Sequence, residues 1–154
     1  MNSSSFFAKI LLFGEYGIIK NSKGISIPFN LYSGSLDIDK SLNKKIKSSN
    51  EQIKSFYDYL KLKFDNDELN FKTFKSDIDD GLYFKSSIPI GYGVGSSGAL
   101  VSAVYDKYSL KKIKIKKKID TEKIIILKNI FSKMESFFHG ESSGLDPINS
   151  YLSN

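Results

Sequence analysis

The chain has 154 residues, with 23 basic and 17 acidic side chains and a formal net charge of +6. It contains no cysteine, which excludes disulfides and cysteine metal ligands, and no apolar run of about 18 residues of the kind that spans a membrane. Every basic side chain is lysine, so the charge is a weak indication of nucleic-acid binding, because arginine reads guanine and phosphate better. Residues 1–5 lack the basic region of a secretory signal. We expect one cytoplasmic domain that contacts neither nucleic acid nor membrane.

Strands dominate the elements predicted before residue 40. A buried strand is expected over Phe6–Phe13, where Lys9 alone interrupts an apolar run. The Gly-Glu-Tyr-Gly segment at 14–17 predicts a turn. Two more strands are expected over 25–32 and 34–39, the second because apolar side chains alternate with acidic ones.

A helix is predicted next, because apolar side chains recur at helical spacing between Ile53 and Phe64. Ser49 and Gln52 have the spacing of a capping box, which places the helix start nearby. The later predicted elements are a strand over 69–74, a turn over 77–81, a strand over 82–88, a helix over 96–108 and a helix over 121–138 closed by Gly140. This pattern predicts an α+β domain with a mixed β-sheet and packed helices, of which two or three are the main ones.

A lysine-rich run occupies residues 111–118. Such a cluster is usually a solvated loop or a strand edge, and we expect that here. A nucleic-acid-binding surface is the alternative, although no aromatic side chain within the run could stack on bases.

The glycine loop, residues 89–99, carries the clearest chemical signal. Alternate glycines permit positive φ and a close backbone approach to a ligand, and a helix is expected to begin directly after them. A helix N-terminus presents unpaired N–H groups and the positive end of a dipole, which favours a phosphate. Ser96 and Ser97 are expected to cap that helix or to reach a phosphate or its metal. The residues predicted to bind nucleotide phosphates are Gly91, Gly93, Gly95, Ser96, Ser97 and Gly98.

The glycine loop is neither of the two commonest phosphate motifs. No lysine follows Gly95, as a Walker loop requires. Gly93, Gly95 and Gly98 match the dinucleotide pattern G-x-G-x-x-G, but the lysine run stands where that motif has an acidic residue, about 20 residues on. A glycine-rich turn before an ordinary helix remains the alternative.

Three segments together, and in this order, resemble the motifs of the GHMP kinases, with the closest similarity to mevalonate kinase. In residues 8–19 a lysine and an apolar run precede Gly-Glu-aromatic. The glycine loop is the second segment. In the third, residues 135–147, a glutamate is followed by His-Gly-x-x-Ser-Gly-x-Asp. The resemblance implies the fold of the amino-terminal, ATP-binding domain of such a kinase, a ribosomal-protein-like βαβ arrangement.

The resemblance also implies roles for single residues. Asp146 would accept the proton of the substrate hydroxyl, and Lys9, a lone charge in a buried strand, would pair with it and keep it ionised. Glu135 would hold Mg²⁺ together with the hydroxyl of Ser97 or Ser96. The substrate would contact Glu15, His139 and Gly144.

Each role has an ordinary alternative that the sequence leaves open. Asp146 could be a turn residue, Lys9 a snorkelling or edge-strand lysine and Glu135 a solvent-facing helix residue. His139 could simply cap its helix.

The implied activity is ATP- and Mg²⁺-dependent phosphorylation of a small alcohol, most specifically mevalonate to phosphomevalonate in isoprenoid synthesis. Alternatives are a phosphomevalonate, homoserine or sugar kinase, and a non-catalytic ligand-binding protein of the same fold. The resemblance places the whole of 1–154 in the amino-terminal domain. We therefore expect a truncated chain without the family's carboxy-terminal domain, inactive by itself; a homodimer is compatible with this reading.

Overall fold

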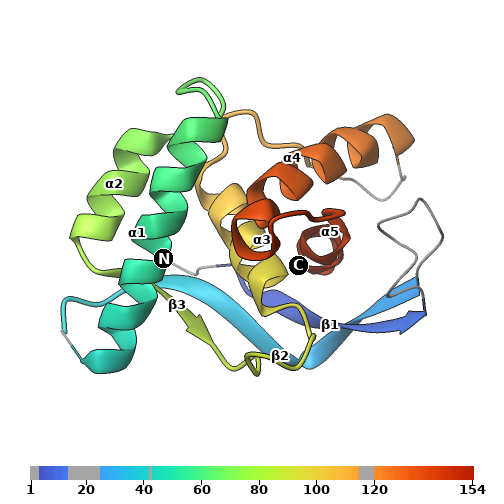
Figure 1. The fold of residues 1–154 in the computed structure, drawn as a ribbon, viewed down its shortest axis with the longest axis horizontal. Helices are drawn as coiled ribbons and strands as arrows, with labels where there is room; N and C mark the ends of the chain where they lie inside the picture. Colours follow the sequence, from blue (N-terminus) through green and yellow to red (C-terminus); the bar gives the residue numbers. More distant parts are fainter. Residues whose placement is uncertain (1–3, 14–24, 42, 115–119) are drawn as a thin grey trace.

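The structure is a computed structural model that describes residues 4–13, 25–41, 43–114 and 120–154. Within them the chain forms, in order, β1 (Phe6–Phe13), β2 (Ile25–Ile38), α1 (Lys44–Lys63), α2 (Phe71–Asp79), β3 (Leu82–Ser86), α3 (Ser96–Tyr108), α4 (Thr121–His139) and α5 (Leu145–Leu152). The helices lie together on one side of a twisted sheet (Figure 1). The predicted α+β class is confirmed.

The sheet has the strand order β1-β2-β3. Both pairs are antiparallel, so the part of the sheet that the structure describes lacks the parallel pair expected of a mixed sheet. Two strands were expected where one long strand, β2, is found. Gly34 joins its two halves, because it pairs with Phe6 of β1 and with Ser86 of β3. A Cβ at Gly34 would lie 2.2 Å from the Phe84 ring, so the missing side chain is what lets that ring cover the strand.

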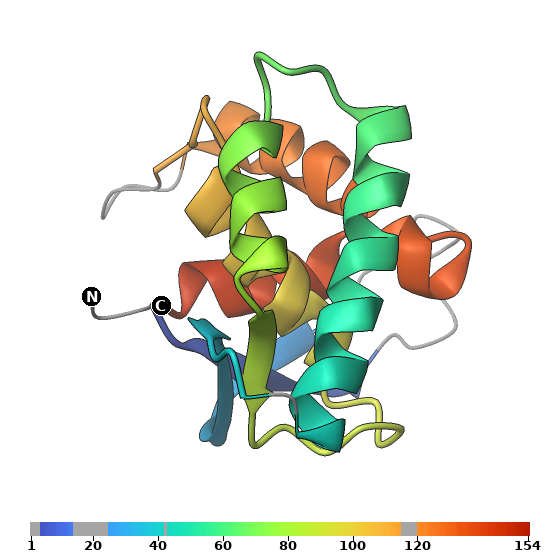
Figure 2. The same ribbon diagram turned by 90° about the vertical axis from the view of Figure 1, so that its left-hand side faces the viewer.

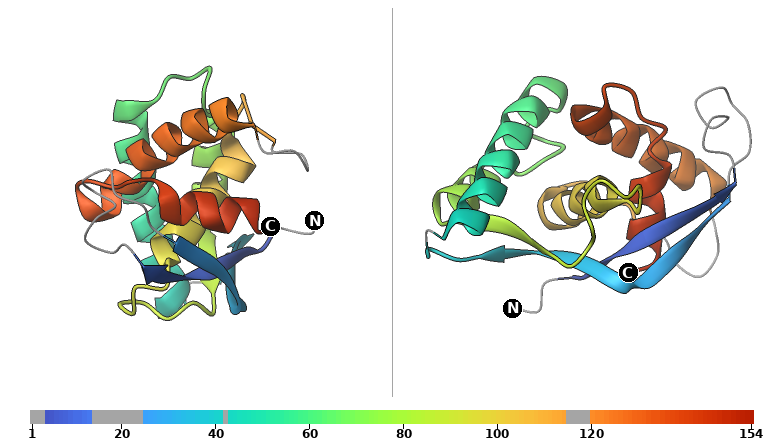
Figure 3. Two further views of the ribbon diagram at one scale, coloured as in Figure 1. Left: turned by 90° about the vertical axis from the view of Figure 1, so that its right-hand side faces the viewer. Right: turned by 60° about the horizontal axis from the view of Figure 1, so that its bottom comes forward.

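The helices form a layer over the sheet. α3 and α5 pack directly on β1 and β2, α1 packs on β3, and α4 covers α3 and α5 (Figure 3). α1 and α2 run side by side in opposite directions (Figure 2). Within the described residues, no helix is both long enough and apolar enough to cross a bilayer.

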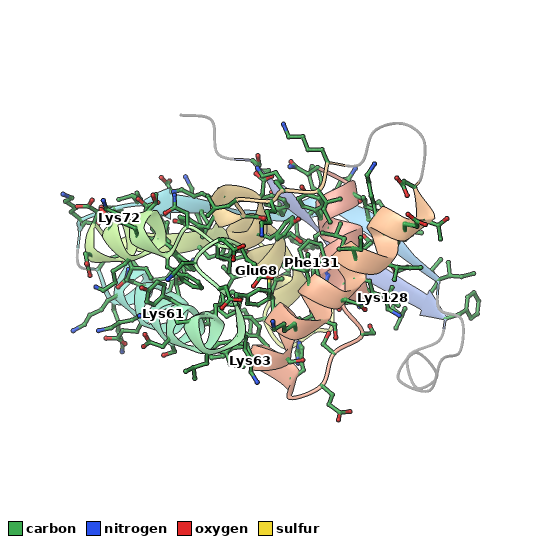
Figure 4. The ribbon with its side chains drawn as sticks, turned by 90° about the horizontal axis from the view of Figure 1, so that it is seen from above. Lys61, Lys63, Glu68, Lys72, Lys128 and Phe131 are labelled. Atoms are coloured by element: carbon green, nitrogen blue, oxygen red, sulfur yellow. The ribbon has the colours of Figure 1, made fainter. Side chains whose placement is uncertain are left out.

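Aromatic rings fill the space between the helices. Phe131 of α4 packs against Tyr105 of α3 with ring centroids 5.0 Å apart, and Phe74 of α2 stacks on Tyr108 of α3 at 4.1 Å. Figure 4 shows Phe131 beside α3 at the centre of the layer, whereas Lys72 lies on α2 at its outer edge. The apolar stripes of the helices therefore meet in one core.

Three local predictions were wrong, two of them because of a cap that the apolar pattern hides. The turn predicted over 77–81 is instead largely the end of α2, which runs to Asp79. The strand expected over 69–74 is instead the start of α2, since the side chain of Asn70 caps it by accepting from the Thr73 N–H. α1 begins at Lys44, capped by Asn43. Ser49 is no cap: it lies inside α1, where its hydroxyl accepts a hydrogen bond from the Phe84 N–H of β3.

Other boundaries are close to those predicted. β1 and α3 have the predicted bounds, α4 ends one residue later than predicted, and β3 ends two residues earlier. The described part of the lysine run forms surface ion pairs, Lys111 with Asp67 and Lys112 with Asp106. Its remainder, 115–118, lies outside the described residues, as does the turn predicted at 14–17.

Candidate functional site

A cleft of about 1450 Å³ opens between the first turns of α1, strand β3 and the glycine loop. Its floor is the N-terminus of α3. Lys44 and Lys45 of α1 line one wall, and Phe138, His139 and Asp146 lie at the end beyond the loop. The cleft combines apolar surface with cations and a helix N-terminus, which suits a ligand with both an apolar and an anionic part.

The glycine loop has the backbone conformation predicted for it. Gly91, Gly93 and Gly95 have φ of 86°, 67° and 84°. Gly95 is the N-cap of α3, and among the residues that the structure describes no side chain accepts from the first turn of this helix. The predicted capping by Ser96 or Ser97 is therefore wrong, because the left-handed glycine already ends the loop and the serine side chains are left for other partners. The N–H groups of the first turn remain available to an anion.

The loop is held against the edge of the sheet. The Lys9 N–H of β1 donates to the Val94 carbonyl at 2.9 Å. A Cβ at Gly95 would lie 2.9 Å from Cγ of Lys9, so the lysine stem passes directly beneath the glycine. A side chain at position 95 would displace either the loop or the lysine.

The buried Lys9 reaches Asp146, as predicted. Its Nζ lies 3.1 Å from Oδ1 of Asp146, and the lysine side chain is 6% exposed whereas the aspartate side chain is 34% exposed. The aspartate is in the first turn of α5, whose N-cap is Gly144, and not in a loop. The ion pair explains how a charge can lie in the buried strand β1, and it leaves Asp146 accessible to a ligand.

Close packing of α3 on α5 fixes the position of Asp146. A Cβ at Gly98 would lie 2.8 Å from the backbone carbon of Asp146. The buried Ser102 hydroxyl bridges the helices through the Gly98 and Pro147 carbonyls, at 2.8 and 2.7 Å. The aspartate therefore has little freedom to move relative to the glycine loop.

Glu135 of α4 is buried, at 3% exposure, and is not a solvent-facing residue. The hydroxyl of Ser97 approaches its Oε1 at 3.4 Å, and the Ser142 hydroxyl donates to Oε2. Burial is the main reason why the pKa of Glu135 rises to about 7. Neighbouring Asp146 raises this pKa further, whereas the two serine hydroxyls and Lys9 lower it.

The hydroxyl of Ser97 has a second partner in His139. The Nε2 atom lies 3.0 Å from Ser97 Oγ, so serine, glutamate and histidine form one hydrogen-bonded group. His139 is the last residue of α4 and also lines the cleft. The structure thus brings it to the end of the cleft formed by the glycine loop, beside α3.

A second, smaller cavity of about 190 Å³ lies between α5 and the β1–β2 pair. Four aliphatic residues line it, including Leu11 from β1 and Ile148 from α5, and so do four polar ones, Ser26, Asp146, Asn149 and Ser153. Among the described residues, Asp146 is the one that lines both cavities.

Two predicted site residues remain, Gly144 and Glu15. Gly144 packs against the backbone of α4, where a Cβ would be 2.4 Å from the Lys128 carbonyl oxygen, so it shapes the start of α5. Glu15 lies outside the described residues. Sequence reasoning missed Ser142, because its position in the motif is unspecified. It also missed Lys44 and Lys45 of the cleft wall, because α1 was expected to start later.

The chain was compared with known protein families. The family model described as "GHMP kinases N terminal domain" matches residues 52–154. The matched region contains the glycine loop, Glu135 and Asp146, but it begins after Lys9. Among curated proteins, none matches the chain.

Proposed function

The chain belongs to the GHMP kinase family, and from this premise we propose that it binds ATP in the large cleft and serves phosphoryl transfer to a small alcohol at Asp146. The observation that carries the proposal is the convergence of three groups at one end of the cleft. These are the uncapped N-terminus of α3, the pair Glu135–Ser97, and the ion pair Lys9–Asp146.

Phosphate binding would rest on the glycine loop. The free N–H groups of α3 and its dipole attract negative charge. Lys44 and Lys45 add two cations from the opposite wall of the cleft. The apolar surface between these groups would accommodate the base of a nucleotide.

A divalent cation fits the oxygen atoms beside the loop. Ser97 Oγ and Glu135 Oε1 lie 3.4 Å apart and face each other at the N-terminus of α3. A carboxylate and a hydroxyl are ligands that Mg²⁺ accepts together with phosphate oxygens and water. When bound, Mg²⁺ would supply charge neutralisation on the transferring phosphate.

Asp146 would take the proton from the acceptor hydroxyl. Its carboxylate lies 3.1 Å from the Lys9 ammonium, and a carboxylate within hydrogen-bond reach of a hydroxyl can act as a general base. Asp146 lines both cavities. This supports an arrangement in which the phosphate donor lies in the cleft and the acceptor alcohol lies in the smaller cavity.

We further propose mevalonate as the acceptor, because the sequence resemblance favours it and four aliphatic side chains line part of the small cavity. Leu11, Leu145, Ile148 and Leu152 suit a short branched chain better than a polyhydroxylated sugar. The reaction in a cell would be cytoplasmic and would feed isoprenoid synthesis. A non-catalytic ligand-binding protein is the alternative, but the Lys9–Asp146 pair favours catalysis.

Calorimetry of ATP binding with and without Mg²⁺ tests the nucleotide part of this proposal. We expect Ser97→Ala and Glu135→Ala to weaken binding with Mg²⁺ more than binding without it. Equal losses under both conditions would contradict the metal role. ADP release measured with mevalonate, phosphomevalonate, homoserine and galactose, in a preparation whose unmodified form is active, then tests the acceptor.

A further inference from the structure

The Glu135 carboxylate is held at both of its oxygens, and the two partners come from different parts of the chain. Ser97 of α3 approaches Oε1, and Ser142 of the α4–α5 connection donates to Oε2. Position 142 is one of the unspecified positions in the motif His-Gly-x-x-Ser-Gly-x-Asp. The motif therefore gives Ser142 no role.

The hydrogen bonds around Ser142 fix the direction of its hydroxyl proton. The Gly144 N–H lies 3.1 Å from Ser142 Oγ and can only donate. The hydroxyl oxygen therefore accepts from Gly144, and its own proton points to Oε2 of Glu135. The Ser142 carbonyl in turn accepts from the Ser132 hydroxyl of α4 at 2.5 Å, which holds the residue from its other side.

This arrangement determines which carboxylate oxygen faces the cleft. With Oε2 occupied by the Ser142 proton, Oε1 is the oxygen directed to Ser97 and the glycine loop. Because Gly144 is the N-cap of α5, the same hydroxyl links Glu135 to the helix that carries Asp146. We infer that Ser142 is a positioning residue that orients Glu135 for divalent-cation binding.

This inference rests on the proposed function, since it assumes that Glu135 and Ser97 hold the cation of a metal–nucleotide complex. Outer partners of metal ligands typically contribute about 10- to 100-fold to metal affinity. We expect Ser142 to act at the low end of that range, because it contacts one of the two protein ligands and the nucleotide supplies others.

The test compares Ser142→Ala, Ser142→Thr and Ser142→Cys with the unmodified chain. The threonine variant keeps the hydroxyl, and the cysteine variant keeps nearly the same volume with a much weaker donor. Ser136→Ala is the matched control, because the Ser136 hydroxyl bonds within α4 to the Ser132 carbonyl. ATP affinity is measured by calorimetry with and without Mg²⁺, and Mn²⁺ binding in the presence of ADP by electron paramagnetic resonance.

We expect alanine and cysteine at 142 to weaken Mg²⁺-dependent ATP affinity and Mn²⁺ affinity about tenfold. Metal-free ATP affinity should stay within about twofold, which also shows that the variants fold, and threonine should restore metal binding. Unchanged metal binding in both hydroxyl-free variants, or equal loss with and without metal, would overturn the inference. If the unmodified chain itself shows no Mg²⁺ dependence, the proposed function fails instead.

Discussion

Lys9 and Asp146 come from opposite ends of the described chain and meet as an ion pair of 3.1 Å beneath the glycine loop. The lysine is buried in β1, and the aspartate opens α5. Neither residue alone indicates catalysis, but a buried cation that holds a partly exposed carboxylate beside a phosphate-binding loop suits a general base.

Asp146→Asn is expected to remove phosphoryl transfer while leaving ATP affinity unchanged. The amide keeps the shape of the side chain but cannot take a proton, and loss of a general base lowers turnover about 10²–10⁴-fold. Turnover is measured by ADP release, and ATP affinity by calorimetry, in a preparation whose unmodified form is active. Near-normal turnover would show that another group accepts the proton.

Gly98→Ala is expected to destabilise the protein even though alanine favours helices. Its Cβ would lie 2.8 Å from the Asp146 backbone, so α5 must shift away from α3. Overpacking of this kind costs about 1–3 kcal/mol, and a shift of about 1 Å in Asp146 lowers turnover about 10²-fold. Chemical denaturation measures the loss of stability, and Gly98→Val should lose more stability than Gly98→Ala. A stabilised alanine variant would contradict the close packing.

Glu135→Gln is expected to make stability less dependent on pH. The pKa of Glu135 is about 7 in the folded protein and near 4.5 ordinarily, so the folded state binds an extra proton between these values. The contribution of Glu135 to the free energy of unfolding is therefore complete below about pH 4.5, and it is lost as the pH rises through 7. At about 1.4 kcal/mol per pKa unit, this loss of stability is on the order of 3 kcal/mol.

Urea denaturation between pH 5 and pH 8 measures this difference. We expect the unmodified chain to lose stability relative to the glutamine variant as pH rises, with similar stabilities near pH 5. Glu141→Gln is the control, because Glu141 is exposed and should leave the pH profile unchanged. Parallel profiles for the unmodified chain and Glu135→Gln would show that the glutamate titrates normally.

His139→Ala is expected to weaken Mg²⁺-dependent ATP binding several-fold, whereas His139→Gln should retain it. The reason is the 3.0 Å contact between Nε2 and the Ser97 hydroxyl, which a glutamine amide can reproduce. Calorimetry with and without Mg²⁺ measures this effect. If His139 instead contacts the alcohol, as the sequence resemblance suggested, the alanine variant would raise the KM for the alcohol and leave ATP affinity unchanged.

Much of the fold follows from local patterns. β1 and α3 were predicted with the bounds that the structure has. An apolar run marks β1, and small and apolar residues mark α3, because burial of these side chains outweighs the effect of the residues at the ends of each element. α2 could not be predicted in the same way. Leu69 and Phe71 alternate with polar residues as in a strand, which is why a strand was predicted over 69–74, but the Asn70 cap begins a helix there.

The sequence by itself determined the chemical identity of the candidate site. The motifs singled out Lys9, Glu135, Ser97 and Asp146, and the cost of burying a lone charge predicted that the lysine would pair with the aspartate. These inferences rest on the resemblance of three motifs to those of the GHMP kinases, and motifs can be read from a single chain.

Only the tertiary structure decided how these groups are oriented. Three contacts join different segments of the chain, and their lengths depend on how α3, α4 and α5 pack. They are the hydrogen bond from Ser142 to Glu135, the contact of His139 with Ser97 and the close approach of Gly98 to Asp146. Hydrogen bonds require atoms to lie within a few tenths of an ångström of a fixed distance. Spacing along the chain does not contain that information, because it is the packing of the helices that sets the distances between them.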